Sequence, residues 1–287
     1  MPRELAGVVL CGGRSRRMGR AKALLPWRSV TLIEHVVSVL AEVTDDIVIV
    51  TSADSHLPEF SADVAPRVVR DREPHLGPLA GIREALEIIT KPLAYVTSTD
   101  APFLTPEFVR AMASHGKCAA PEVDGFVQSL SAVYETRLAD AANRLLREER
   151  RRPLFLLQAG DFVAIREDDL VDRRSLENLN TPESYLTAVA ADHAERGATP
   201  APVVVELYGL ARQRAGVDHL EAGYGLLGEV LRAAGHACPN LGLVREGRSD
   251  LPAEFLVSIG GRDFVRDPGV PIGPGEHVVV MDAAAGG

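Results

Sequence analysis

Short apolar runs alternate with segments of helical periodicity over the first two hundred residues, and this alternation restricts the possible folds more than any other feature. Continuous apolar runs at residues 7–10, 47–50, 68–69 and 93–96 are typical of strands buried on both faces. Apolar residues at helical spacing fill 32–40 and 82–89, and Pro106 opens a further helical segment. Strands that alternate with helices predict an α/β fold with a mostly parallel sheet and helices on both sides.

A second, smaller domain is predicted behind a polar segment rich in glycine, proline and alanine at residues 196–201. Apolar runs at 203–207, 255–259 and 277–281 predict strands, and residues 226–231 suit one short helix. Several strands with one principal helix are typical of a small α+β domain. We therefore expect domains at 1–195 and 202–287, joined by a linker at 196–201.

Charge and cysteine content exclude several classes of function. The 287 residues carry a formal net charge of -9, which argues against nucleic acid or an anionic membrane as a partner. The three cysteines, Cys11, Cys118 and Cys238, form no paired motif, which argues against a disulfide framework and a thiolate zinc site. No apolar run approaches the roughly 20 residues of a membrane span, and no signal-peptide pattern is present. We expect a cytoplasmic protein.

A glycine-rich, basic loop directly follows the first predicted strand. Gly12 and Gly13 allow backbone N–H groups to approach an anion without hindrance from a Cβ atom. Five cations follow within nine residues of this acidic protein: Arg14, Arg16, Arg17, Arg20 and Lys22. The glycine spacing fits neither the P-loop nor the dinucleotide-binding motif. The alternative is a tight turn with a solvated basic face, but the position after a strand favours a polyphosphate site.

Two carboxylates also follow predicted strands. Asp71 ends the run at 68–69, and residues 77–81 then turn the chain into a helix. Asp100 follows the run at 93–96, and a single carboxylate suits Mg²⁺, which takes further ligands from water and phosphates. Asp100 could instead cap the next helix, but Thr105, one residue before a proline, is the better cap.

The glycine-rich loop resembles a family signature. Residues 10–22 read L-C-G-G-R-S-R-R-M-G-R-A-K, similar to the L-A-G-G-x-S-x-R-M-G-x-D-K of MobA-like nucleotidyltransferases, specifically the molybdenum cofactor guanylyltransferases. The resemblance implies a Rossmann-like nucleotidyltransferase fold and a loop that holds the triphosphate of GTP. The residues implied in this contact are Leu10, Cys11, Gly12, Gly13, Ser15, Arg17 and Lys22, with Arg17 and Lys22 also catalytic. The chain departs from the signature at Cys11, for alanine, and at Ala21, for the aspartate that orients the lysine.

Further motifs extend the resemblance to residues 5–190. Asp71 and the loop residues Pro78, Leu79 and Gly81 are implied in recognition of guanine or its ribose, and Ser52 stands where the family often has asparagine. The family's D-x-P motif implies that Asp100 is catalytic and holds Mg²⁺, with Asn180 of its N-x-N-T-P-E motif near the metal. Asn180 could otherwise cap the helix that follows. Gln128 and Ser129 replace a histidine and a proline that face the pterin in the family.

The implied reaction is in-line nucleotidyl transfer. The terminal phosphate of molybdopterin, the precursor of the molybdenum cofactor, attacks the α-phosphorus of GTP, and pyrophosphate leaves. Because a phosphate monoester is already an anion, no strong general base is needed, and the sequence contains no nucleophile–histidine pair. We expect His35 and His56 to be surface or half-buried residues.

Residues 203–287 resemble the MoaD-like sulfur carriers of molybdopterin synthase, which have a ubiquitin-like β-grasp fold. The similar segments are 205–212, 255–262 and 273–278, and small residues lead to a terminal Gly286 and Gly287. The resemblance implies that an E1-like enzyme adenylates the Gly287 carboxylate, which becomes a thiocarboxylate and donates sulfur on the large synthase subunit. Asp282 and Ala283 replace a common pair of prolines, and Gly260 replaces an asparagine.

Two alternatives stay open from the sequence. The transferase could use CTP with the same pterin, or a sugar phosphate. The C-terminal domain could be a non-catalytic ubiquitin-like binding module, and its last residues a frayed terminus.

Overall fold

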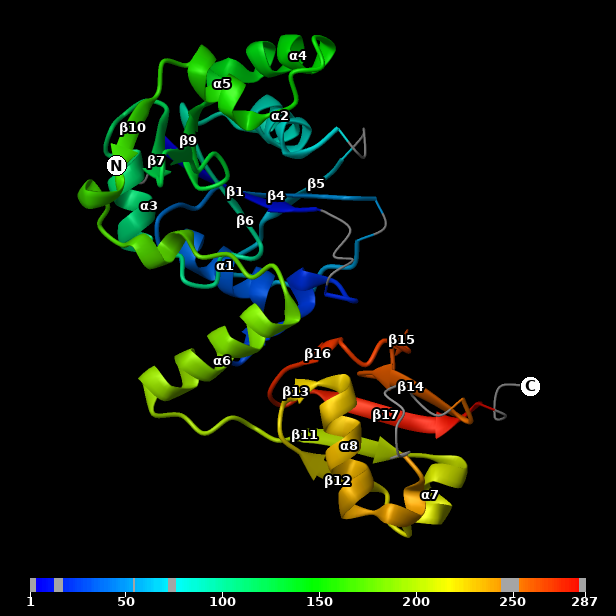
Figure 1. Cartoon of the computed structure of the whole chain (residues 1–287). Coiled ribbons are helices and arrows are strands. Elements are labelled where there is room, and N and C mark those ends of the chain that lie inside the picture. Colours follow the sequence, from blue (N-terminus) through cyan, green and yellow to red (C-terminus); the bar gives the residue numbers. More distant parts are fainter. Residues whose placement is uncertain (1–3, 13–17, 54, 72–75, 244–252, 284–287) are drawn as a thin grey trace. The chain divides into compact units, whose positions relative to one another are not determined.

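The computed structural model describes residues 4–12, 18–53, 55–71, 76–243 and 253–283, and it divides into two compact units. The first unit comprises Met1–Arg14 and Val30–Asn178, and the second comprises Ser15–Ser29 and Leu179–Gly287. Figure 1 labels most of the helices and strands of both units. No helix among the described residues is long and apolar enough to cross a membrane.

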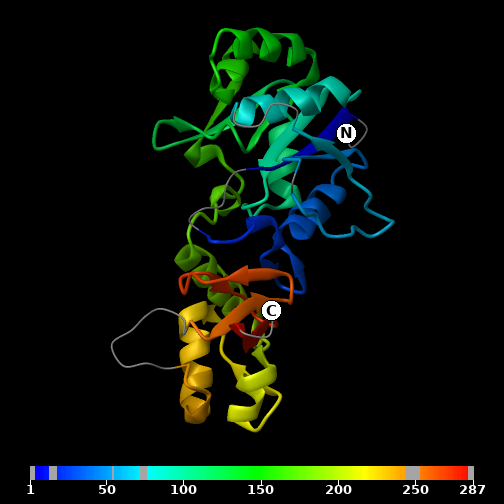
Figure 2. The same ribbon diagram turned by 90° about the vertical axis from the view of Figure 1, so that its right-hand side faces the viewer.

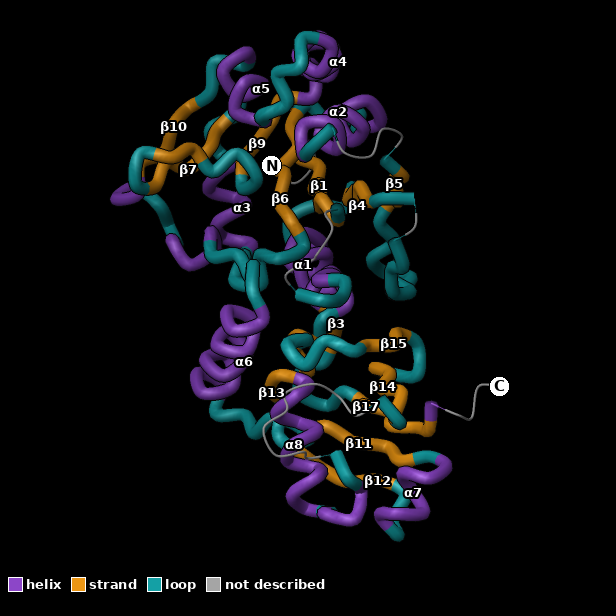
Figure 3. Tube along the Cα trace, turned by 45° about the vertical axis from the view of Figure 1, so that its right-hand side comes forward, coloured by secondary structure: helices purple, strands orange, loops and turns teal. Residues whose placement is uncertain are grey.

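An eight-stranded sheet forms the centre of the first unit, with the strand order β10-β7-β9-β6-β1-β4-β5 and β8 paired to β7. The strands are β1 (Leu5–Cys11), β4 (Ile47–Thr51), β5 (Arg67–Arg70), β6 (Leu93–Ser98), β7 (Ala119–Val123), β8 (Phe126–Val127), β9 (Ala132–Glu135) and β10 (Val163–Arg166). The neighbours β6, β1, β4 and β5 run parallel, whereas β9 runs antiparallel to both β6 and β7. The predicted mostly parallel α/β sheet is therefore confirmed. Figure 3 shows its strands in orange and the helices in purple.

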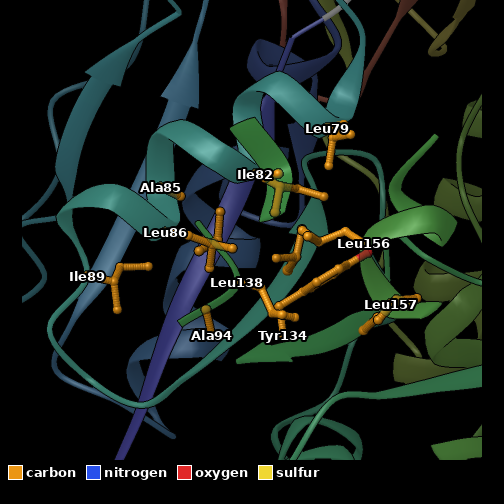
Figure 4. Packing of buried hydrophobic residues seen from close by; sticks show 14 of the residues in the cluster. Leu79, Ile82, Ala85, Leu86, Ile89, Ala94, Tyr134, Leu138, Leu156 and Leu157 are labelled. Carbon is orange, nitrogen blue, oxygen red and sulfur yellow. The ribbon is translucent and has the colours of Figure 1, made fainter. Parts of the chain in front are cut away.

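Helices cover both faces of this sheet. On one face lie α2 (Pro78–Ile88), α4 (Ala139–Arg147) and α5 (Pro153–Ala159), and on the other lie α1 (Leu32–Ala41) and α3 (Pro106–Ala113) (Figure 1). The first face holds a continuous apolar core, in which Leu79, Ile82 and Leu86 of α2 meet Leu156 and Leu157 of α5 (Figure 4). Short 3-10 turns at Thr136–Leu138, Glu167–Asp169 and Arg173–Leu176 connect the elements.

One strand of the first unit differs from its predicted burial. The run at 68–69 reads as a buried strand, but Val68 in β5 is 43% exposed. The reason is its position, since β5 is the last strand of the sheet and has a neighbour on one side only.

A five-stranded mixed sheet forms the centre of the second unit, with the order β12-β11-β17-β14-β15. The strands of this unit are β11 (Val203–Leu207), β12 (His219–Ala222), β13 (Gly225–Leu226), β14 (Phe255–Ile259), β15 (Asp263–Val265), β16 (Pro271–Ile272) and β17 (His277–Asp282). The helices α7 (Gly209–Ala215) and α8 (Leu227–Ala237) accompany them, drawn yellow and orange in Figure 2, with a 3-10 turn at Pro239–Leu241. Alternate residues of the strands pack against Leu227, Val230 and Leu231 of α8. The predicted strands and principal helix are confirmed.

The second unit also contains two segments that the sequence pattern assigns to the first domain. One is α6 (Pro182–Arg196), and the other is Ser15–Ser29, which includes the 3-10 turn η2 (Lys22–Leu24) and β2 (Pro26–Trp27). The short strand β3 (Val30–Thr31) begins the return to the first unit. The compact units divide the chain after residues 14, 29 and 178 and not at residue 195. The domain boundary at 195 and the linker at 196–201 stay predictions.

Candidate functional site

Four of the predicted site residues follow the carboxyl ends of adjacent parallel strands in the first unit. The strand ends lie in register, with Cys11 opposite Thr51, Thr51 opposite Arg70, and Leu10 opposite Ser98. Gly12, Ser52 and Asp71 come directly after these strand ends, and Asp100 comes two residues after Ser98. Loops at this edge of an open parallel sheet are the usual place for a ligand.

Arg70 fixes the loops after β4 and β5. Its guanidinium donates hydrogen bonds to the carbonyl oxygens of Ser52, at 3.0 Å, and Ser55, at 2.9 Å. The Ser52 and Ser55 hydroxyls bond each other at 2.6 Å, and the backbone N–H of Asp71 donates to the Thr51 carbonyl at 2.7 Å. Arg70 does not stand out in the sequence, where its only signal is its place at the end of a strand and before an acidic residue.

The half-buried Asp100 lies in a loop that other segments support. The Ser98 hydroxyl donates to its Oδ1 at 2.5 Å. The carbonyl oxygen of Pro102 lies 2.8 Å from Nε2 of His35, which is buried in α1. The expectation that His35 is a surface or half-buried residue is therefore wrong, because its ring holds this loop. Thr105 caps α3 by accepting from the backbone N–H of Phe108, as predicted, so Asp100 is not the cap.

The predicted loop at residues 77–81 is the start of α2. Gly77 is the N-cap with φ +85°, a conformation that glycine adopts without strain, and Pro78 is the first helical residue. Leu79 is fully buried, and a Cβ on Gly81 would lie 3.2 Å from Cδ2 of Leu10. Leu79 and Gly81 therefore pack α2 onto the sheet.

Cys11, at the end of β1, is buried. Burial raises the pKa of its thiol, and this effect outweighs the opposing hydrogen bond with Thr51 and the charge of Arg70. The side chain is a neutral thiol at physiological pH.

Two motifs that lie 158 residues apart in sequence meet in the second unit. Lys22, the last residue of the glycine-rich signature, donates from Nζ to Oδ1 of Asn180 at 2.9 Å. The cap of α6 is Thr181, which accepts from the backbone N–H of Ser184 in a capping box. Asn180 therefore lies one residue before the cap, and its side-chain oxygen contacts the lysine, which in this chain lacks the preceding aspartate of the signature.

Several predicted residues lie outside the described part of the chain or have another partner. Gly13, Arg14, Ser15, Arg16, Arg17, Gly286 and Gly287 are not among the described residues. Arg20, predicted as one of five cations for a polyphosphate, forms an ion pair with Glu276 of the second unit. Gln128 is half-buried, and its amide donates to the carbonyl oxygen of Phe126.

A surface cavity of about 730 Å³ lies on the face of the five-stranded sheet that α8 leaves uncovered, with Val279 and Met281 among its lining residues. His277 pairs there with Glu206, and the hydrogen bond from this histidine lowers the pKa of the Glu206 carboxyl. Among the described residues, none of those predicted for the nucleotide lines this cavity.

Comparison with known proteins identifies the first unit. The family model described as MobA-like NTP transferase domain matches residues 7–166. A protein of Mycobacterium tuberculosis named probable molybdenum cofactor guanylyltransferase is 37% identical over 187 residues, covering 62% of this chain and 89% of the relative. A protein of the same name from Mycobacterium avium is 37% identical over 201 residues, covering 67% of this chain and 98% of the relative.

A solved structure agrees with these relatives. The crystal structure of molybdopterin-guanine dinucleotide biosynthesis protein A from Archaeoglobus fulgidus superposes with a TM-score of 0.57 at 25% identity, covering 66% of this chain and 99% of that protein. The family match spans more than half of this chain and contains β1, β4, β5 and β6 with the loops that follow them. The chain is therefore a nucleotidyltransferase that belongs to the MobA-like NTP transferase family.

Proposed function

We propose that the chain transfers GMP from GTP to molybdopterin, which gives the guanine dinucleotide form of the molybdenum cofactor and pyrophosphate. The observation that carries this proposal is the common strand edge in the first unit, after which Gly12, Ser52, Asp71 and Asp100 all follow. The choice of GTP over CTP rests on the names of the relatives that are 37% identical.

The residues of the chain have separate tasks in this reaction. Backbone N–H groups of the loop that begins at Gly12, together with the Lys22 ammonium, offset the negative charge of the triphosphate. Asp71 and the start of α2 at Pro78 recognise guanine or its ribose. Because the attacking phosphate is already ionised, the enzyme has to position two polyanions and reduce their repulsion, and it needs no general base.

Mg²⁺ is implied by the family, and the residues fit it. Mg²⁺ prefers hard oxygen ligands, usually one or two carboxylates with waters and phosphates. The carboxylate of Asp100 supplies this chemistry, although no group of three acidic, histidine or cysteine residues suited to a metal occurs in the described ranges. When bound, the ion would neutralise charge on the phosphates.

Incubation of the full chain with GTP, Mg²⁺ and molybdenum-loaded molybdopterin tests the proposal, with chromatographic detection of the guanine dinucleotide. Asp100→Ala is expected to abolish turnover, because it removes the proposed metal ligand. Lys22→Ala is expected to raise KM more than it lowers kcat, because it removes charge that binds the triphosphate. Asp140→Ala, an exposed carboxylate in the first turn of α4, is the matched control. Absence of the dinucleotide with wild-type protein contradicts the function.

Calorimetric competition between GTP, CTP and sugar nucleotides separates the alternative substrates. Tighter binding of CTP, or transfer to a sugar phosphate, would replace the guanylyl assignment with one of these alternatives. Binding of GTP with no transfer to the pterin would instead mean that the proposed nucleotide is right and the proposed acceptor is wrong.

We further propose that residues 202–287 form a ubiquitin-like sulfur carrier. In its support, the first and last strands of this segment, β11 and β17, are parallel neighbours at the middle of the sheet, and α8 covers one face. The uncovered face, with its cavity, would bind an E1-like adenylating enzyme and the large subunit of molybdopterin synthase.

The start of the carrier's tail is held in place. Oδ2 of Asp282 accepts from the backbone N–H of Leu210 at 2.6 Å, and the Ala283 N–H donates to the Glu254 carbonyl at 2.9 Å. Asp282, where the family commonly has proline, thus ties the end of β17 to α7. The tail beyond this point would present the Gly287 carboxylate, which becomes the AMP anhydride and then the thiocarboxylate.

Mass spectrometry tests the carrier after incubation with ATP, an adenylating enzyme of the E1 type and a sulfur donor. Replacement of one oxygen by sulfur adds about 16 Da, and deletion of Gly286 and Gly287 is expected to prevent the gain. A chain that never gains this mass but still binds the synthase subunit would be a non-catalytic binding module instead.

A further inference from the structure

A buried ion pair joins the nucleotide signature to the C-terminal sheet domain within the second unit. Nη1 of Arg20 lies 2.8 Å from Oε2 of Glu276, with side-chain exposures of only 8% and 12%. Nη1 also lies 3.4 Å from the carbonyl oxygen of Pro271, and the same glutamate oxygen accepts from the Gly273 N–H at 2.8 Å. Glu276 belongs to the turn between β16 and β17, which the sequence matches to the carrier rather than to the transferase.

Further contacts hold the residues on both sides of Lys22, a stretch at residues 19–28 that we call the anchored segment. Before Lys22, a Cβ on Gly19 would lie 2.5 Å from Cγ2 of Val270, so the backbone approaches that side chain closely. After Lys22, the Tyr185 hydroxyl of α6 donates to the Pro26 carbonyl at 2.7 Å. At the end of the segment, Arg28 forms an ion pair with the buried Asp192 at 2.8 Å.

We propose that Glu276 is a positioning residue of the transferase, which fixes the anchored segment and thereby holds Lys22 in place for the triphosphate. The inference rests on the proposed function of Lys22. A buried arginine requires an opposite charge, so Arg20 keeps its place only while the β16–β17 turn provides the carboxylate. Lys22 follows two residues later, and a lysine on a fixed backbone loses less conformational freedom when it binds a phosphate.

The C-terminal domain thereby has a second role. The domain proposed to carry sulfur also completes the support of the nucleotide signature, so deletion of the domain would weaken the transferase. Binding energies couple in both directions, so GTP bound at Lys22 would also stabilise the anchored segment on its sheet. Arg20 accordingly acts through Glu276 and not as a phosphate ligand.

The chain contains one tryptophan, and it reports on the anchored segment directly. Trp27 lies in β2 and is 1% exposed, so its fluorescence and its quenching by acrylamide measure whether the segment is held. The variants are made in the full chain: Glu276→Gln, Glu276→Asp and Arg20→Met. Glu254→Gln is the matched control, because Glu254 forms an exposed ion pair with Arg214 elsewhere in the same domain.

We expect Glu276→Gln to raise the KM and the Kd for GTP about tenfold, to change kcat by less than about twofold, and to increase quenching of Trp27. Glu276→Asp, which keeps the charge, is expected to give an intermediate KM, and Glu254→Gln is expected to match wild type. Where Glu276→Gln fails to fold, Arg20→Met carries the test, because it leaves Glu276 and its bond to Gly273 in place. The combined Arg20→Met and Glu276→Gln variant should be no worse than either single change.

Two results overturn the inference: unchanged GTP parameters in Glu276→Gln, or a higher KM with Trp27 still as protected as in wild type. In the second case the arginine or the glutamate would contact the nucleotide directly. Wild-type protein that forms no dinucleotide contradicts the proposed function instead, and the comparison of GTP binding with Trp27 quenching then still decides the positioning role.

Discussion

Gly273 offers a sharp test of the packing in the second unit. A Cβ at this position would overlap the hydroxyl oxygen of Tyr185 and lie 3.1 Å and 3.2 Å from Cγ and Cβ of Pro26. Gly273→Ala therefore forces Tyr185 away from the Pro26 carbonyl that it binds at 2.7 Å. Overpacking costs about 1–3 kcal/mol. The lost hydrogen bond adds about 1–2 kcal/mol. We expect the free energy of unfolding to fall by about 2–5 kcal/mol.

Tyr185→Phe supplies the partner change for a double-mutant cycle. Alone it leaves the Pro26 carbonyl without this donor, at a cost of about 1–2 kcal/mol. In the phenylalanine background the overlapping oxygen is gone, so the double variant should lose at least about 1 kcal/mol less than the sum of the single changes. Gly275→Ala is the matched control in the same turn, since its Cβ would meet only Ala201 at 3.6 Å and its φ of +76° costs about 1–2 kcal/mol.

Urea unfolding followed by Trp27 fluorescence measures all four variants, because this tryptophan belongs to the same unit. Additive losses in the cycle would refute the reasoning, as would equal losses for Gly273→Ala and Gly275→Ala. Either result would mean that the Tyr185 hydroxyl does not occupy the space beside Gly273.

Other properties of the chain can be tested in solution. A thiol reagent at pH 8 is expected to modify the half-buried Cys238 first, because burial raises the pKa of Cys118 to about 11 and also raises the pKa of Cys11. The order of labelling is measured by peptide mass, and fast labelling of Cys11 would contradict it. Burial raises the pKa of Asp192, but hydrogen bonds from Arg28 and a second arginine outweigh it and lower the pKa below its usual value. The ionised Asp192 therefore stabilises the fold at any pH above the usual pKa of a carboxyl. This contribution is lost as the pH falls through the lowered pKa of Asp192 in the folded protein. In urea unfolding, the advantage of wild type over Asp192→Asn should be present at neutral pH and shrink below about pH 4.

The sequence predicts the central sheet well because both of its faces are covered. Strands such as β1 and β4 must be apolar on each side, which produces continuous runs that a reader of the sequence recognises. Because these strands run parallel, the residues that follow them lie at one edge of the sheet, and Asp71 and Asp100 can be assigned to that edge from the sequence alone. The cap at Thr105 was equally predictable, since it depends on two neighbouring residues only.

Long-range pairing accounts for what the sequence does not reveal. Arg20 reads as one of five cations, and nothing near it in sequence indicates a carboxylate 256 residues away. His35 has the same limitation, because its partner is the backbone oxygen of Pro102, which any residue type provides. Sequence motifs identified Lys22 and Asn180 separately, but the bond between their side chains required the fold.

The separation of Arg20 from Glu276 also sets an order of events during synthesis. A ribosome that adds about 5–20 residues per second needs about 13–50 s to reach the glutamate after it has made the arginine. Until synthesis reaches Leu179, the nascent protein carries Met18 and Trp27, both destined for the interior, with the remainder of their unit still unmade. Newly made chains must therefore keep this stretch in solution or on a chaperone until the remainder of the unit follows, and a premature stop before Leu179 releases it exposed.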